Sequence, residues 1–185
     1  MVVEHGYERW EGKGALGYLV LARIVEAQIF DPPSRARLVV ASRTFPTGFL
    51  GYWVRRLADN GLVAALTTTS PARLANPEGG PPLAGTNPLA LAIPSSEGNP
   101  LVADVSMGKV TYGDVLRGAA DPAELVPFGG EQAHKAFALA VGLHMFVSAL
   151  AGEDHGAVML VARPEHDPVP GLRARAQGVR LPGDG

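Results

Sequence analysis

The chain has 185 residues, of which 46 % are hydrophobic and 18 % are charged, a composition typical of a folded globular protein and not of a disordered one. Its net charge of -2 and the lack of a basic run argue against nucleic acid as a partner, and the absence of cysteine excludes disulfides and thiolate nucleophiles. We see no signal peptide and no apolar run of the roughly 20 residues that a membrane span needs. We therefore expect a cytoplasmic protein that does not enter a membrane.

The first part of the chain alternates helical and strand patterns. Apolar residues at helical spacing predict a helix over 15–30, which Asp31-Pro32-Pro33 ends. A second helix is predicted over 48–60, where Asn60-Gly61 is typical of a left-handed cap. Apolar and β-branched runs predict strands over 37–41, 62–68, 89–93 and 101–104.

The second part of the chain contains the longest predicted helix, residues 134–150. It is apolar nearly all round, so we expect it to be buried. A short helix is predicted before it at 111–117 and a central strand after it at 156–162; the remainder is loop apart from a helical turn at 172–177. These elements predict one mixed α/β domain over residues 1–185.

One motif is more specific than the rest. A glycine pair, Gly79-Gly80, leads into a Gly-Thr-Asn-Pro turn at 85–88, and an apolar strand follows at once and ends at Pro94. This stretch resembles the signature of the malate/L-lactate dehydrogenase family, which also contains sulfolactate dehydrogenases and cyclic imine reductases. Further segments resemble the same family in the same order: residues 12–17, 48–53, 62–71, 104–110, 125–140 and 179–184.

The resemblance implies a fold and a class of reaction for a truncated and divergent member. The implied fold is of the α+β type, a single mixed and largely antiparallel sheet flanked by helices, as in sulfolactate dehydrogenase. It is not a Rossmann fold, and the chain indeed has no Gly-x-Gly-x-x-Gly that opens a helix after a first strand. The implied activity is the reduction of a small 2-oxo acid or cyclic imine with NADP or NAD, in a homodimer with a biosynthetic role.

The resemblance also indicates cofactor-binding residues. They are Gly85, Thr86 and Asn87 in the signature turn, Lys109 in a Gly-Lys-Val element, and Gly129 and Gly130 in a Pro-x-Gly-Gly element. For the signature turn, the alternative is an ordinary tight turn before a strand. For Lys109, the alternative is a solvated lysine.

Candidate catalytic residues are Lys135, His134 and Asp104. Lys135 stands at the family lysine near a helix start, where it would suit a cofactor phosphate or a substrate carboxylate; its alternative is a lysine that extends from a buried helix to solvent. His134 is a candidate proton donor beside it. Asp104 follows a strand and would orient a base or bind substrate, unless it is a turn or cap residue. Arg43 and Thr44 are candidate substrate-binding residues, with an exposed loop arginine as the alternative for Arg43.

The main departure from the family lies in one loop. Where relatives have Asn-Ser-Asn-His-Phe-Gly, this chain has Arg43 to Gly48, with Pro46 at the histidine position. Reduction of a ketone needs a proton donor near the carbonyl oxygen, which proline cannot supply. His5 is a candidate replacement, and an imine that arrives already protonated is the preferred substrate.

The altered loop leaves a second function open. A non-redox homologue in a specialised pathway, either a cyclase or isomerase or a binding subunit, remains the alternative. Among the other histidines, His144 is expected to be a satisfied core residue, and His155 and His166 to be surface residues. No histidine pair has the spacing of metal ligands, so no metal site is expected.

Overall fold

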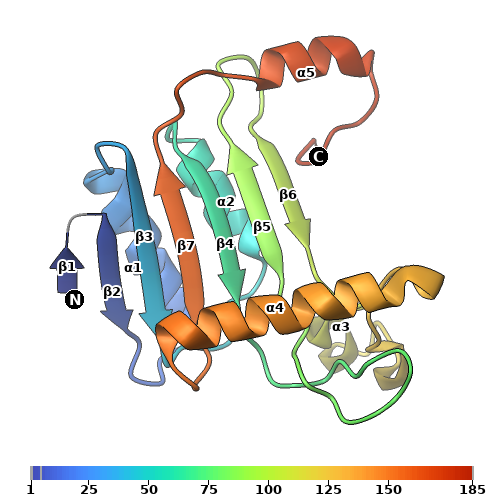
Figure 1. Cartoon of the computed structure of the whole chain (residues 1–185). Helices are drawn as coiled ribbons and strands as arrows, with labels where there is room; N and C mark the ends of the chain where they lie inside the picture. Colours follow the sequence, from blue (N-terminus) through green and yellow to red (C-terminus); the bar gives the residue numbers. More distant parts are fainter. Residues whose placement is uncertain (1, 5, 185) are drawn as a thin grey trace.

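In the part of the chain that the structure describes, seven strands form one sheet, which is mixed and largely antiparallel as expected. The computed structural model describes residues 2–4 and 6–184, and its strand order is β1-β2-β3-β7-β4-β5-β6 (Figure 1). Only β2 and β3 pair in parallel; every other neighbouring pair is antiparallel. The strands are β1 Val2–Glu4, β2 Tyr7–Glu11, β3 Ala36–Ser42, β4 Val63–Thr68, β5 Leu89–Ile93, β6 Leu101–Val105 and β7 Ala157–Ala162.

Two helices cover one face of the sheet and build the main core. They are α1 (Gly17–Phe30) and α2 (Leu50–Ala58), which lie behind the sheet in Figure 1. Their buried faces, which include Leu21 and Leu57, pack against alternate residues of the central strands, such as Leu66. Because side chains in a strand alternate between the two faces, only one face of each strand belongs to this core.

The opposite face of the sheet is only partly covered. Helix α4 (Ala133–Ala151) runs across the strands near their lower ends in Figure 1 and contacts β3, β4 and β7. Beyond α4 the face is apolar and open to solvent: Leu91 and Leu160 are 40 % and 44 % exposed, and both lie opposite Ala65 in the ladder. The remaining helices are short: α3 Tyr112–Leu116, α5 Val169–Ala176, and single turns at Pro122–Glu124 and Gly130–Gln132.

The expectation that the longest helix is buried is wrong. The buried residues of α4 are Ala133, Ala136, Ala140, Val147 and Ala151. Its other side carries Leu139, Met145 and Phe146, which are 52 %, 61 % and 48 % exposed. The sheet covers only one side of α4, and an all-round apolar sequence does not reveal which side has a neighbour.

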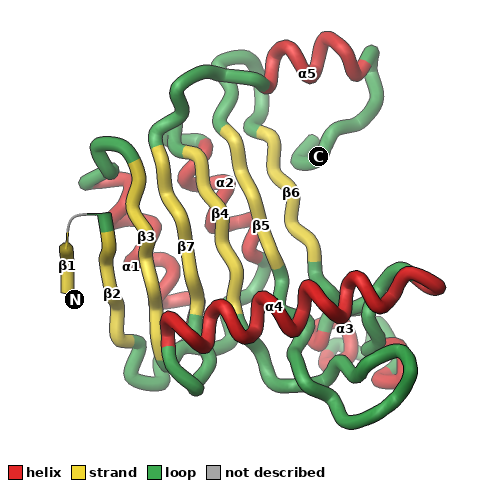
Figure 2. Tube along the Cα trace, viewed as in Figure 1, coloured by secondary structure: helices red, strands yellow, loops and turns green. Residues whose placement is uncertain are grey.

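Helix α4 also bears on the expected absence of a membrane span. Within the described part of the chain, the stretch Gly130–Ala151 is long and apolar enough to cross a membrane by length and composition. This is weak evidence, since core helices of soluble proteins meet the same criteria. In the structure the helix lies against the sheet instead of standing apart from it (Figure 2).

The sequence did not predict β2, which contains a buried charged residue. Glu8 is only 3 % exposed, and its carboxylate accepts hydrogen bonds from Gln28 Nε2 at 3.0 Å and from Trp10 Nε1. Arg37 Nη1 lies 3.6 Å from the same carboxylate and donates to Gln28 Oε1 at 2.8 Å. Burying an ionised carboxylate is costly unless it is paired and hydrogen-bonded. This network therefore joins β2, β3 and α1 in one specific arrangement.

Candidate functional site

The candidate site residues gather along one edge of the sheet. The loops that follow β2, β3, β4 and β6, and the loop that precedes β7, all lie at this lower edge in Figures 1 and 2. Two cavities are found here, a larger one of about 680 Å³ and a smaller one of about 350 Å³.

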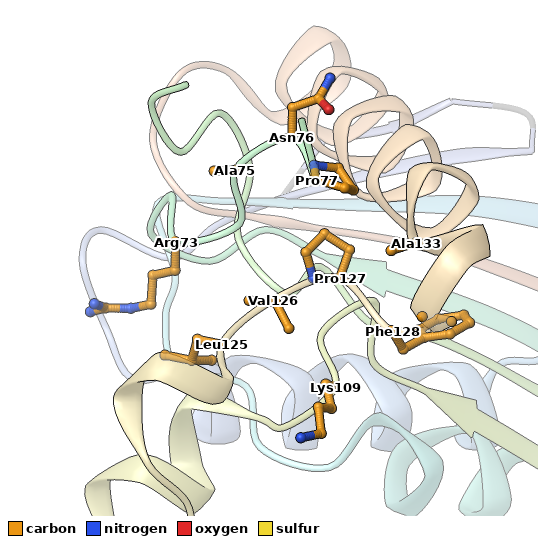
Figure 3. A pocket seen from close by; sticks show the side chains of 12 residues that line it. Arg73, Ala75, Asn76, Pro77, Lys109, Leu125, Val126, Pro127, Phe128 and Ala133 are labelled. Carbon is orange, nitrogen blue, oxygen red and sulfur yellow. The ribbon is translucent and has the colours of Figure 1, made fainter. Parts of the chain in front are cut away.

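The larger cavity is lined by the loop after β4 and by the segment between β6 and α4. Figure 3 shows Pro127 and Val126 between Arg73 on one side and Phe128 and Ala133 on the other. Most of the wall is apolar, so the cavity suits a flat ring or another apolar group. The full lining is Arg73, Ala75, Asn76, Pro77, Lys109, Leu125, Val126, Pro127, Phe128, Gly129, Gly130 and Ala133.

Two cations stand at the wall of the larger cavity. Lys109 Nζ lies 2.6 Å from Glu124 Oε1, and this ion pair lowers the pKa of the Glu124 carboxyl. The Arg73 guanidinium lies over the ring of Tyr112, 3.5 Å from its centre, in a cation–π contact. Arg73 Nε is buried and has no hydrogen-bond partner among the described residues. The cavity therefore joins an apolar wall to fixed positive charge.

Gly129 and Gly130 fit this wall because of their backbone conformation. Their φ angles are +107° and +56°, in the left-handed region that favours glycine. The pair turns the chain from the cavity wall into α4, which starts three residues later. Of the six expected cofactor-binding residues, Lys109, Gly129 and Gly130 thus line one cavity.

The other three expected cofactor-binding residues, Gly85, Thr86 and Asn87, do not lie at the larger cavity. They are buried and line neither cavity. Asn87 is fully buried: its Oδ1 accepts a hydrogen bond from Ser70 N at 3.1 Å, and its Nδ2 donates to Ala140 O at 2.8 Å. A Cβ on Gly85 would lie 2.5 Å from Ser70 O, so the two loop segments approach too closely for any side chain there. In this structure the signature turn connects the β4–β5 loop to α4.

The smaller cavity contains both expected substrate-binding residues. Arg43 and Thr44 line it together with Lys13, Gly14, Phe45, Asp154 and His155. Arg43 Nε lies 2.9 Å from Glu11 Oε1, and this pair raises the pKa of Arg43 and lowers that of Glu11. Thr44 is buried, and its Oγ1 donates to Ala15 O at 3.1 Å. Thr44 therefore fixes the loop, while Arg43 presents its charge at the cavity.

Two histidine expectations are corrected. His155 is not a surface residue: it is partly buried, lines the smaller cavity, and has its ring 5.1 Å from that of Phe45. Burial, and then the nearby His144, lower the pKa of His155, while Asp154 raises it. His144 is not a satisfied core residue either, because its buried Nδ1 has no partner among the residues described.

The three candidate catalytic residues lie outside both cavities. Asp104 Oδ2 accepts a hydrogen bond from Gly51 N at 2.7 Å, so its carboxylate caps the start of α2. Burial raises the pKa of Asp104, and its hydrogen bonds from Gly51 and Leu50 oppose that shift. His134 and Lys135 are exposed in the first turn of α4. His5 lies outside the described residues.

Most lining residues of the two cavities were not identified from the sequence as site residues, among them Arg73, Phe128, Lys13 and His155. Arg73 and Phe128 belong to the larger cavity, and Lys13 and His155 to the smaller one. Each comes from a different loop, and only the sheet topology brings these loops to the same edge. In the sequence, two of these residues could have been found by their place beside family motifs. Phe128 directly precedes the glycine pair, and Lys13 lies within the glycine-rich segment at 12–17.

The larger cavity fits the cofactor that the family implies. Its volume lies within the roughly 300–1,000 Å³ of small-molecule sites. Its apolar residues, Val126, Pro127 and Phe128, suit a nucleotide ring, and Arg73 and Lys109 suit phosphate groups. Bound there, a reduced nicotinamide would supply the hydride, and these residues would hold and orient it.

Curated relatives match parts of this chain. A (2R)-3-sulfolactate dehydrogenase (NADP(+)) from Chromohalobacter salexigens is 38 % identical over 111 residues, which are 58 % of this chain and 33 % of that protein. A Δ(1)-pyrroline-2-carboxylate/Δ(1)-piperideine-2-carboxylate reductase from Pseudomonas putida is 29 % identical over 177 residues, or 81 % of this chain and 51 % of the relative. The chain thus spans between a third and about half the length of these two relatives.

Solved structures show the same fold. The Δ1-piperideine-2-carboxylate reductase of Pseudomonas syringae superposes with a TM-score of 0.78 at 20 % identity, covering 100 % of this chain and 70 % of the other. The malate dehydrogenase of Entamoeba histolytica gives 0.79 at 19 % identity, covering 100 % and 68 %. The family model described as malate/L-lactate dehydrogenase matches residues 3–125, more than half of the chain. By this match, the protein belongs to the malate/L-lactate dehydrogenase family.

Proposed function

We propose that this protein is an NAD(P)H-dependent reductase of a small 2-oxo acid or cyclic imine. The observation that carries the proposal is the cavity of about 680 Å³, because family-motif residues Lys109, Gly129 and Gly130 form part of its wall. The relatives described as sulfolactate dehydrogenase and as pyrroline-2-carboxylate and piperideine-2-carboxylate reductases support the same class of reaction.

Of the two nicotinamide cofactors, NADP is the one we favour. Arg73 and Lys109 offer two fixed cations at one cavity, and the extra phosphate of NADP is a dianionic group that such a pair recognises. Each cation already has a neighbour, Tyr112 for Arg73 and Glu124 for Lys109. A phosphate would compete with Glu124 for Lys109, so we expect binding to tighten when Glu124 is neutralised.

Cofactor binding is tested by fluorescence titration of NADPH and NADH. We expect saturable binding of NADPH and weaker binding of NADH. Lys109→Ala should bind NADPH at least about tenfold more weakly, since a charge-assisted hydrogen bond contributes roughly 1.5–3 kcal/mol. Lys135→Ala is the matched variant, because Lys135 is a family lysine outside the cavity. If only Lys135→Ala weakened binding, the cofactor would lie at the start of α4 instead. No binding of either cofactor at millimolar concentration would remove the proposal.

The alternative is a repurposed, non-redox homologue, either a cyclase or isomerase or a binding subunit. The observation that favours it is Pro46, which stands where the family has a histidine. This alternative predicts no cofactor binding in the same titration, so one experiment separates the two functions.

We also propose a homodimer formed through the outer side of α4. This side carries the exposed apolar residues Leu139, Met145 and Phe146, and soluble monomers rarely expose large apolar patches. Two copies related by a twofold axis would cover these side chains on both helices, because such an interface uses the same surface patch of each copy.

Light scattering tests this assembly. We expect twice the 19.3 kDa monomer mass at micromolar concentration, and the monomer mass for Phe146→Glu. Exposed Leu116→Glu on α3 is the control and should stay dimeric. A monomeric wild-type protein would contradict the proposal.

A further inference from the structure

The smaller cavity lies at the loop where the family histidine is missing. Phe45, the residue before Pro46, lines it, and the ring of His155 lies 5.1 Å from the ring of Phe45 at an interplanar angle of 53°. His155 comes from the loop before β7, more than a hundred residues later in the chain. A different histidine therefore reaches the loop that lacks its own.

The backbone around His155 is held in place on both sides. Thr44 N donates to His155 O at 2.8 Å, which ties the altered loop to the histidine. The next residue, Gly156, donates its N–H to Thr69 Oγ1 at 3.0 Å and accepts from Thr69 N at 3.0 Å. Groups fixed in this way lose little freedom when a ligand binds, which favours binding and catalysis.

The charges around the cavity are nearly balanced. Arg43 is paired with Glu11, Asp154 contributes one negative charge to the wall, and Lys13 has no ion pair among residues 2–4 and 6–184. His144 is the other titratable group close to His155. With His155 neutral the cavity has no net charge, and with His155 protonated it is positive. An anion should therefore bind most tightly to the form of the protein in which His155 carries a proton.

We propose that this cavity binds the carboxylate of a small 2-oxo acid beside Lys13 and Arg43, and that His155 is the acid that protonates the carbonyl oxygen. The inference rests on the proposed reductase function and narrows its substrate class from 2-oxo acids and cyclic imines to 2-oxo acids alone. A cavity of about 350 Å³ is suited to an acid of a few carbon atoms. The proton that reduction requires would then be taken up together with the substrate.

The reaction balances with one hydride and one proton. A reduced nicotinamide, when bound, would supply the hydride for the new C–H bond at the carbonyl carbon, and the π electron pair would move to oxygen. His155 then gives its N–H proton to that oxygen and becomes neutral. The products are a 2-hydroxy acid and the oxidised nicotinamide, so the 2-oxo acid is reduced by two electrons.

The two cavities are compatible with a single extended cofactor. The smaller cavity lies at the ends of β3 and β7, and the larger one beyond β4 and β6, along the same sheet edge. Three strand spacings, from β3 through β7 and β4 to β5, amount to roughly 15 Å at about 4.8 Å each. A dinucleotide held by Arg73 and Lys109 is of a length that bridges this separation.

The test measures binding before it measures turnover. Oxamate, an isostere of pyruvate that is not reduced, is titrated by calorimetry without cofactor at pH 5.5 and pH 8, and the pKa of His155 is followed by NMR of the imidazole signals. We expect saturating oxamate to raise this pKa by at least about one unit, because a carboxylate within about 4–6 Å favours the imidazolium. By linkage, a shift of one pKa unit makes oxamate bind more tightly at pH 5.5 than at pH 8, by up to about tenfold.

His155→Gln should abolish this pH dependence, while His166→Gln, a change at an exposed loop histidine, should keep it. With NADPH and pyruvate, His155→Gln should lower kcat by on the order of 10²–10⁴-fold. An unchanged His155 pKa at saturating oxamate, or no oxamate binding at all, would overturn the inference even if NADPH binds. Loss of NADPH binding with normal oxamate linkage would instead overturn the reductase function and leave the anion site in place.

Discussion

Asn87 offers a quantitative test of how the signature turn works. In the structure its buried amide joins Ser70 N, at 3.1 Å, to Ala140 O, at 2.8 Å, and so connects the β4–β5 loop to α4. Asn87→Ala removes two hydrogen bonds with a net value of about 0.5–1.5 kcal/mol each, and leaves the Ser70 N–H without that partner. We expect the free energy of unfolding to fall by about 2–4 kcal/mol, measured by urea denaturation at fixed protein concentration with an unchanged m-value.

Asn60→Ala is the matched control for this substitution. The Asn60 amide also makes one hydrogen bond, to Arg56 O at 2.8 Å, but in an exposed position, so the loss should stay within about 0.5 kcal/mol. A loss below about 1 kcal/mol for Asn87→Ala would refute the argument that this motif holds α4 in place. If Asn87→Ala had normal stability but no longer bound the cofactor, Asn87 would be a cofactor-binding residue instead.

Three further predictions concern stability. Arg37→Met should lower the free energy of unfolding by about 3–5 kcal/mol in urea, because it leaves Glu8 buried without its cationic partner; a loss under 1 kcal/mol would contradict a stabilising Arg37–Glu8 pair. The pKa of Asp104 is raised in the folded protein. The contribution of Asp104 to stability is therefore fully present below its unfolded pKa of about 3.9, and it is lost as the pH rises through the pKa of the folded state. Asp104→Asn should therefore lose less stability than wild type between pH 4 and pH 7, and parallel curves would refute the shift. Thr69→Val should lower the free energy of unfolding in urea by about 1–3 kcal/mol, because it leaves the Gly156 N–H unpaired; an unchanged value would contradict this contact.

Local sequence patterns predicted the helices and strands well where proline or glycine marks their ends. The strand over 89–93 was predicted with the bounds it has, because Pro88 precedes it and Pro94 follows it. The cap at Asn60-Gly61 was also correct: Gly61 has φ +76°, and its N–H bonds to Ala58 O. β2 was not predicted because Tyr7–Glu11 mixes charged and aromatic residues, and because Gln28 of α1 and Arg37 of β3, two of the partners of Glu8, are distant in sequence.

The candidate site could be predicted only in part, and the reason is spatial. Lys109 and the Gly129–Gly130 pair share a cavity, as the family motifs imply. Arg73 comes from another loop, and His155 reaches the loop at Phe45 across more than a hundred residues, so no spacing in the sequence relates them. Likewise, the apolar character of α4 was visible, but which side the sheet covers depends on the tertiary arrangement.

The most direct test of the central claim is a crystal structure of the protein with NADPH. The account predicts density for the dinucleotide in the cavity of about 680 Å³, with a phosphate at Arg73 or Lys109 and a ring against Phe128. Density that extends along the sheet edge toward His155 would join the two cavities in one active site. A cavity that remains empty at millimolar NADPH, or a cofactor bound at another face of the molecule, would contradict the account.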